Sequence, residues 1–146
     1  MALTTFGAIM GFAAGMAKRG QEVYQAAFEK AKAPLLRDAL QDLHKEQGKN
    51  QALMEMTRRE HVTEMILEPI TGLRQEDYEM HVVVPGQAND ADLLKIALVV
   101  EEMQKKFFSD CSAKIPLPEV VRIFQKVARK RESNLEKLGN LGLTKG

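Results

Sequence analysis

The chain has 146 residues, of which 45% are hydrophobic and 28% are charged, and its formal net charge is +1. These values are typical of a globular protein, and the length suits one domain with a buried core. Acidic and basic residues are interspersed along the chain, which argues against binding to nucleic acid or to an acidic membrane. The single cysteine, Cys111, leaves no partner for an internal disulfide, so by default we expect a cytoplasmic protein.

The first predicted helix begins with an apolar run over residues 6–17. Its nearest positive charges, Lys18 and Arg19, follow the run, whereas a signal segment would carry them in front. The run is also shorter than the roughly 20 residues that cross a bilayer. We therefore expect it to open a helix of the domain.

Three glycines, Gly7, Gly11 and Gly15, recur at every fourth position of this helix. Each glycine costs a helix roughly 1 kcal/mol relative to alanine, so a packing gain should offset the cost. We expect this face to let another backbone approach closely, either within the domain or across a homodimer interface.

The first half of the chain predicts a helical hairpin over about residues 6–57. Apolar residues recur at helical spacing from Ile9 to Phe28 and again from Leu36 to Met54. Pro34 suits the first turn of the second helix, where its missing N–H needs no partner.

A connecting segment over about residues 69–89 follows, after stop signals at Glu68-Pro69 and Thr71-Gly72. It contains an extended-looking run, residues 81–85, with three consecutive valines before a proline. We expect this segment to cross the length of the bundle. A loose loop between ordinary antiparallel helices is the competing interpretation, but long structureless loops are uncommon in compact domains.

A second hairpin is predicted over about residues 90–138. Asn89 or Asp90 can cap its first helix, Pro118 can open its second helix, and Gly139 can end it. The apolar residues between Leu93 and Phe107 again recur at helical spacing.

The two hairpins match each other without gaps at a constant offset of 84 residues. The matched pairs include Ala13 with Ala97, Tyr24 with Phe108, Lys30 with Lys114, Pro34 with Pro118, Leu40 with Phe124, and Asn50 with Asn134. This indicates two copies of one unit. Two tight hairpins joined by one long crossover predict an all-α, ferritin-like four-helix bundle.

These features resemble the rubrerythrin branch of the ferritin-like superfamily, over about residues 6–57 and 92–138. In that family each hairpin has a glutamate seven residues before an aromatic on its first helix, and a Glu-x-x-His motif on its second. Residues at i and i+3 lie on one helix face, so the motif directs a carboxylate and an imidazole at one point. The resemblance therefore implies a buried centre for two metal ions.

The six positions of this chain that match the family's ligands are mostly occupied by poor metal ligands. They are Ala17 and Glu101 before the aromatics, and Gln47, Asn50, Arg131 and Asn134 in the two motifs. Only Glu101 keeps a carboxylate. The site therefore reads as a degenerate di-metal site.

A guanidinium can neutralise a buried carboxylate, and we expect Arg131 to make a bidentate contact with Glu101. Gln47, Asn50 and Asn134 would then satisfy the remaining polar groups. On this hypothesis Glu101→Gln destabilises the fold by roughly 3–5 kcal/mol, because Arg131 loses its partner.

Two functions remain open, and whether the protein is an enzyme stays open with them. The first is a non-catalytic bundle without a cofactor, with a structural or partner-binding role, as a homodimer or other homo-oligomer. The second is a rubrerythrin-like di-iron oxidoreductase with non-standard ligands, Glu101 and His44. One carboxylate is few for a catalytic di-iron centre, which favours the first.

Other reactive side chains have simpler interpretations. Glu60, His61 and Glu64 could share a helix face, but the neighbouring arginines favour a solvated, salt-bridged surface. Cys111 matches a small core position and should be an inert buried thiol. The basic run over residues 126–131 is followed at once by acidic residues and should be a solvated helix face, with one member facing inward.

Overall fold

The computed structural model describes residues 2–61 and 70–141 of the chain. Four long helices account for most of these residues: α1 (Phe6–Lys30), α2 (Pro34–His61), α3 (Asp90–Ser112) and α4 (Pro118–Gly139). A short 3-10 helix, η2 (Gln75–Asp77), lies in the described part of the connection between α2 and α3. The described residues contain no strand beyond an isolated bridge between Ala2 and Arg74. The predicted four-helix, all-α architecture is therefore confirmed.

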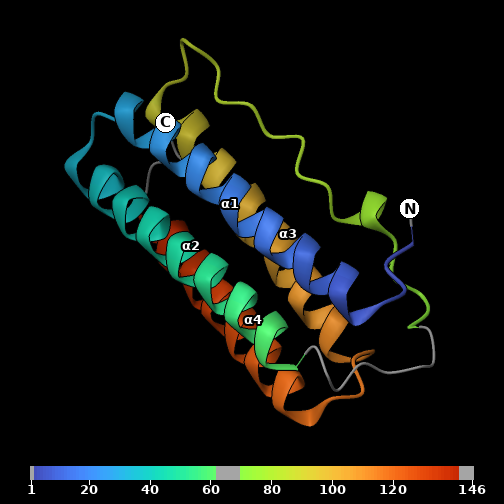
Figure 1. The fold of residues 1–146 in the computed structure, drawn as a ribbon. Helices are drawn as coiled ribbons and strands as arrows, with labels where there is room; N and C mark the ends of the chain where they lie inside the picture. The colour runs from blue at the N-terminus through green and yellow to red at the C-terminus, as the bar shows by residue number, and fades with distance from the viewer. Residues whose placement is uncertain (1, 62–69, 142–146) are drawn as a thin grey trace.

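The helices pair as two hairpins, as Figure 1 shows. α1 packs along α2, α3 packs along α4, and the contacts between the two hairpins are fewer. The turns within the hairpins are short, whereas residues 70–89 of the connection from α2 to α3 run along the length of the bundle. This is the connectivity that the sequence predicts.

The helix starts follow local capping chemistry. Pro34 and Pro118 each occupy the first position of a helix, α2 and α4, where no N–H is needed. Asn89 caps α3 through a capping box with Asp92, at an N···O distance of 2.8 Å. Thr5 caps α1 by accepting from the amide of Ala8. α1 and α3 begin 84 residues apart, as do α2 and α4, so the helix starts keep the offset of the matched residues.

The crossover lies against α1 and α3 as an extended chain with alternating faces. Met80, Val82 and Val84 pack against the core clusters, whereas Val83 is exposed. Arg19 of α1 donates from Nη2 to the carbonyl of Val82 at 2.6 Å. The segment is therefore held to the bundle by side-chain packing and by a backbone contact.

Two more contacts fasten the ends of the crossover. At its beginning, the amide of Leu3 donates to Leu73 and that of Ile70 donates to Thr4, both at 2.9 Å. At its end, the Asp90 carboxylate accepts from the backbone amides in the α1–α2 turn. The predicted stop signals at residues 68 and 69 lie outside the described residues.

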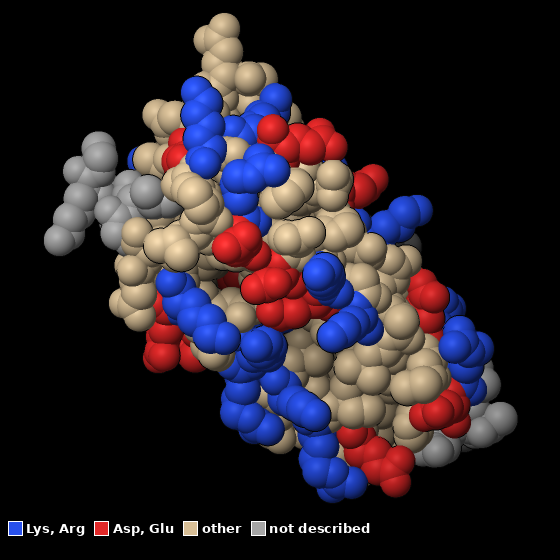
Figure 2. All heavy atoms as spheres, turned by 90° about the vertical axis from the view of Figure 1, so that its left-hand side faces the viewer, with Lys and Arg blue, Asp and Glu red and all other residues tan. Residues whose placement is uncertain are grey.

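The outer surface carries charges of both signs. Figure 2 views the side on which α2 and α4 lie, where Lys and Arg side chains surround a central group of Asp and Glu. Within the described ranges, none of the helices has the length and apolar character needed to traverse a bilayer.

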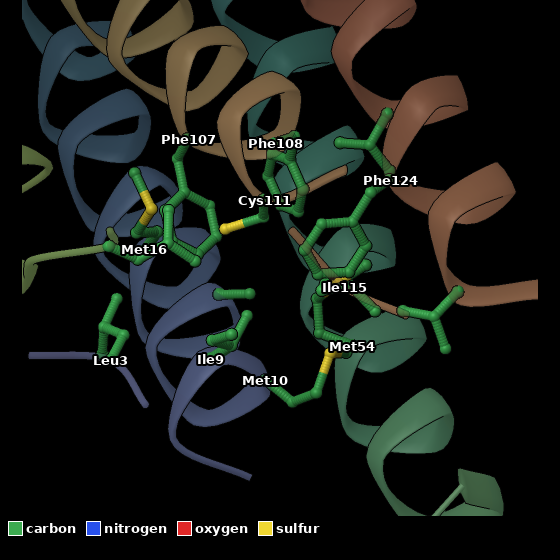
Figure 3. Packing of buried hydrophobic residues seen from close by; sticks show 14 of the residues in the cluster. Leu3, Ile9, Met10, Met16, Met54, Phe107, Phe108, Cys111, Ile115 and Phe124 are labelled. Carbon is green, nitrogen blue, oxygen red and sulfur yellow. The ribbon is translucent and has the colours of Figure 1, made fainter. Parts of the chain in front are cut away.

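The apolar interior is divided into two clusters along the bundle axis. One, at the end where α1 begins, is rich in aromatic and sulfur side chains, with Phe107, Phe108 and Phe124 in mutual edge and tilted contacts. Figure 3 shows these rings packed beside Cys111 and Met54. Cys111 is fully buried there, which confirms the predicted burial, and burial raises the pKa of its thiol to about 12, as expected for an inert thiol.

The second cluster fills the other end of the bundle with aliphatic side chains. Leu36, Leu40, Leu93 and Leu94 are all fully buried there. Between the two clusters every helix contributes to a polar layer, which is described below.

Two expectations need correction. Within the domain, the glycine stripe on α1 faces a side chain and not a backbone: a Cβ at Gly7 or Gly11 would lie 3.6 Å from the guanidinium of Arg58 on α2. The alternative, a homodimer interface at this face, stays a prediction. His61 is buried, with Nε2 3.9 Å from a carboxylate oxygen of Glu119, because the end of α2 packs against α4. A solvated surface at His61 was therefore wrong, and Glu64 lies outside the described residues.

Candidate functional site

The polar layer lies in mid-bundle and includes most of the six positions that the sequence resemblance matches to metal ligands. Glu101 and Gln104 of α3, Gln47 of α2, and Arg131 and Asn134 of α4 are all buried there. In each of these three helices the layer separates residues of one apolar cluster from residues of the other. α1 contributes mainly small residues at this level, together with one tyrosine.

Glu101 is the centre of the layer, and its side chain has no exposed surface. Oε1 accepts from Asn134 Nδ2 at 2.9 Å, and Oε2 accepts from the Tyr24 hydroxyl at 2.7 Å and from Gln47 Nε2 at 3.4 Å. Arg131 Nη1 lies 3.2 Å from Oε1 and 3.3 Å from Oε2. The carboxylate thus has donors on both oxygens, as burial of a charge requires.

Arg131 divides its guanidinium between two carboxylates. Nη1 contacts Glu101, while Nη2 donates to Oε1 of Glu46 at 2.5 Å. The ion pair between Arg131 and Glu101 is as predicted, but the expected bidentate fork on Glu101 is wrong. Glu46 takes the second arm because it stands beside Gln47 on α2, facing α4.

An amide pair fills the space beside α1. Gln47 and Gln104 each donate Nε2 to the other's Oε1 at 2.9 Å, and Gln104 also donates to the carbonyl of Met16 at 3.3 Å. A Cβ at Gly20 would come within 2.6 Å of Gln47 Oε1. Gly20, together with the buried Ala17, therefore leaves room on α1 for the amide pair.

The two asparagines of the matched motifs behave differently. Asn134 is buried, and its Nδ2 donates both to Glu101 and to Glu46, each at 2.9 Å. Asn50 is half-buried, and its Nδ2 finds no acceptor among the described residues. The expectation that Asn50 joins the buried network is therefore wrong, since it lies at the outer seam between α2 and α4.

Burial dominates the electrostatics of the layer. It raises the pKa of the Glu101 carboxyl, against the lowering effects of the Arg131 charge and of the hydrogen bonds from Tyr24 and Asn134. The pKa of the Tyr24 hydroxyl is also raised, first by burial and then by the adjacent Glu101 charge. Both groups are therefore held towards their protonated forms, so Tyr24 serves as a donor.

The layer is a poor match to a metal centre. A divalent ion on Glu101 would meet the Arg131 guanidinium at contact distance, and amides hold most of the other donor positions. Glu101 takes its contacts within the described residues from Tyr24, Gln47, Arg131 and Asn134, and none comes from His44. Across residues 2–61 and 70–141, no three His, Cys, Asp or Glu side chains are grouped to hold a metal ion.

Three members of the network were not identified from the sequence: Glu46, Gln104 and the hydroxyl of Tyr24. Gln104 follows Glu101 by three residues and so shares its helix face, which is a signal that could have been used. Tyr24 matches Phe108 at the 84-residue offset, and the two side chains differ by one hydroxyl. A tyrosine at a position matched by a buried phenylalanine is a signal for a buried hydrogen-bond donor. Nothing in the local sequence distinguishes Glu46 from the other exposed carboxylates of α2.

Searches against protein-family models, curated proteins and solved structures found no match for this chain. The functional argument therefore rests on the geometry of the polar layer.

Proposed function

We propose that this protein is a non-catalytic ferritin-like bundle that has lost its di-metal site and has a structural or partner-binding role. The observation that carries the proposal is the shared guanidinium of Arg131, which contacts Glu101 and Glu46 in the interior. A single fixed cation there provides the neutralising charge that a metal would otherwise supply.

The chain's topology supports the ferritin-like part of the proposal. Ferritin-like bundles have one long crossover, and their metal ligands project inward from all four helices in mid-bundle. The polar layer occupies this level, with contributions from α2, α3 and α4 and with Ala17 on α1. The matched 84-residue spacing of the helix starts further supports an origin from two copies of one hairpin.

The non-catalytic part of the proposal is supported by the state of the polar groups. Glu101 is enclosed by donors on both oxygens, and Gln47 and Gln104 are paired with each other. Catalytic metal centres keep open coordination positions and several carboxylates. A buried carboxylate with donors on both oxygens, beside two amides paired with each other, contributes to a specific fold and does not offer a substrate an open coordination position.

Iron content after aerobic exposure to ferrous iron tests the proposal. We expect less than one tightly held iron per chain after desalting, with no difference between wild type and Glu101→Gln. Glu102→Gln is the matched control, because Glu102 is exposed and adjacent on the same helix. About two irons per chain, as a di-iron bundle holds, lost in Glu101→Gln and kept in the control, would overturn the proposal in favour of the oxidoreductase.

Self-association belongs to the same proposal. An apolar groove between α3 and α4 includes Leu98, Met103 and Leu135, and Val99 beside it is 51% exposed. Light scattering of the purified chain should give a mass above 16.4 kDa if this protein works as a homo-oligomer.

A further inference from the structure

The seam between α2 and α4 is hollowed by an open pocket of about 480 Å³ on the outer side of the polar layer. Four lysines line it: Lys45 and Lys49 from α2, and Lys130 and Lys137 from α4. Figure 2 views this side of the molecule, where basic side chains surround acidic ones. Within the described residues only Lys130 among the four approaches a carboxylate, at 4.0 Å from Glu46.

Two buried hydrogen-bond donors belong to residues that line the same pocket. Arg131 is 1% exposed, and its Nε has no acceptor in the described part of the chain. The same holds for Nδ2 of Asn50. Buried donors without acceptors are costly and uncommon, and here two of them belong to residues that line the same pocket as the four lysines. This second observation is independent of the lysines and points to an acceptor-rich ligand.

The pocket also contains acidic groups, which do not cancel its positive character. Glu46 has its Oε1 committed to Arg131 and Asn134 in the interior. Asp42 is the remaining acidic lining residue. Three of the four lysines have no ion pair among the described residues, so the lining has a surplus of donors and of basic side chains.

We propose that this pocket binds a small molecule bearing a phosphate group. Ammonium groups on flexible stems bind a tetrahedral anion as point charges, and the N–H donors that lack an acceptor belong to Asn50 and Arg131 of the same lining. The volume lies within the range of small-molecule sites. The pocket has no aromatic residue on which nucleic-acid bases could stack, so an individual small molecule fits better than a single strand. The inference does not depend on the loss of the di-metal site.

Calorimetric titration of the full chain with inorganic phosphate, pyrophosphate and a phosphate monoester tests the proposal. We expect saturable binding at one site, and affinity for the monoester above that for free phosphate if the organic part is also held. Lys49→Gln and Lys137→Gln should each weaken binding by about tenfold, because each removes a charge-assisted contact. Asn50→Leu should weaken binding although it leaves the net charge unchanged.

Lys18→Gln provides the matched control, since it removes one exposed lysine from α1, away from the pocket. It should bind like wild type, and thermal melts should show all variants folded. Non-saturable binding, or equal losses in Lys18→Gln and Lys49→Gln, would overturn the proposal by showing a general charge effect. Tighter binding of a single-stranded oligonucleotide or of anionic vesicles through the same lysines would overturn the small-molecule assignment.

Discussion

At the scale of the residue, Arg131 is the side chain on which the buried charges depend. Glu101 and Glu46 both contact its guanidinium, and only Glu46 retains partial access to water, with 24% of its side chain exposed. Removing the cation leaves two carboxylates, whereas neutralising Glu101 leaves the cation with Glu46. Loss of Arg131 should therefore cost more stability than neutralisation of Glu101.

Arg131→Met should destabilise the protein by about 3–5 kcal/mol, as expected when a buried charge loses its partner. Glu101→Gln should cost only about 1–3 kcal/mol, because Arg131 keeps Glu46 and the single amide oxygen can still accept from either Tyr24 or Asn134. This lowers the value expected from the sequence alone. Chemical denaturation of both variants measures the difference, and the double variant should be more stable than Arg131→Met alone. If Glu101→Gln lost more stability than Arg131→Met, the result would contradict the view that Arg131 is shared between Glu101 and Glu46.

Stability should also depend on pH through Glu101. Its pKa in the folded state is raised above the ordinary 4.5 by burial, so the folded state binds the proton more tightly than the unfolded state. The stabilisation from that proton is complete below pH 4.5 and is lost as the pH rises through the folded pKa. Melting curves of wild type and Glu101→Gln should therefore show wild type gaining on the variant as the pH falls. A difference in melting temperature between the two proteins that does not change with pH would contradict this role of Glu101.

How much of the network the sequence predicts depends on which signals survive in the matched positions. Glu101 and Arg131 were identified because they occupy two of the six positions that match the ligands of the resembled family, Glu101 seven residues before Phe108 and Arg131 in the second motif. Asn50 was misplaced, because an equivalent register does not fix how far a helix is rotated about its axis. Glu46 was missed, because its side chain is partly exposed and reaches the buried Arg131 only through a side-chain direction that helix packing sets.

At the scale of the element, the approach of α1 to α2 depends on small residues. Gly20 lies opposite Gln47, whose amide is held by Gln104 and by Glu101. The helix starts and caps were predictable, because proline and asparagine act locally. The role of Gly20 was not, because nothing in α1 reveals which side chain of α2 faces it.

Gly20→Ala should destabilise the protein by about 1–3 kcal/mol, even though alanine favours a helix by roughly 1 kcal/mol. The added methyl group would stand 2.6 Å from Gln47 Oε1, and displacing that amide breaks its pairing with Gln104. Gly15→Ala is the control, since nothing lies within 4 Å of a Cβ there, and it should be neutral or stabilising. Equal thermal shifts for both variants would show that the close approach does not matter.

At the scale of the whole molecule, the crossover is a covering segment attached at a few points. Tyr78 anchors its first half: the hydroxyl donates to Asp110 Oδ2 at 2.7 Å, and the ring meets Phe107 edge-on. The sequence predicted that this segment spans the bundle but not what it contacts, because the anchors are single side chains without a repeating pattern.

Tyr78→Ala should therefore open the crossover before the helices unfold. We expect about 3 kcal/mol of lost stability, as for deletion of a buried ring, and faster amide hydrogen exchange over residues 75–84. Val83→Ala is the matched control, because that side chain is 75% exposed and its loss should leave exchange unchanged. Faster exchange throughout the helices without a local change in the crossover would contradict this view.

The polar layer also bears on which arrangement of the four helices can form. If α4 slid along its neighbours by one turn, about 5.4 Å, Arg131 would leave Glu101 and enter an apolar cluster, where its charge would have no counterpart. Aliphatic side chains above and below would tolerate such a slip far better. The polar layer thus fixes the axial register of the helices, because alternative alignments would bury the Arg131 charge without a partner.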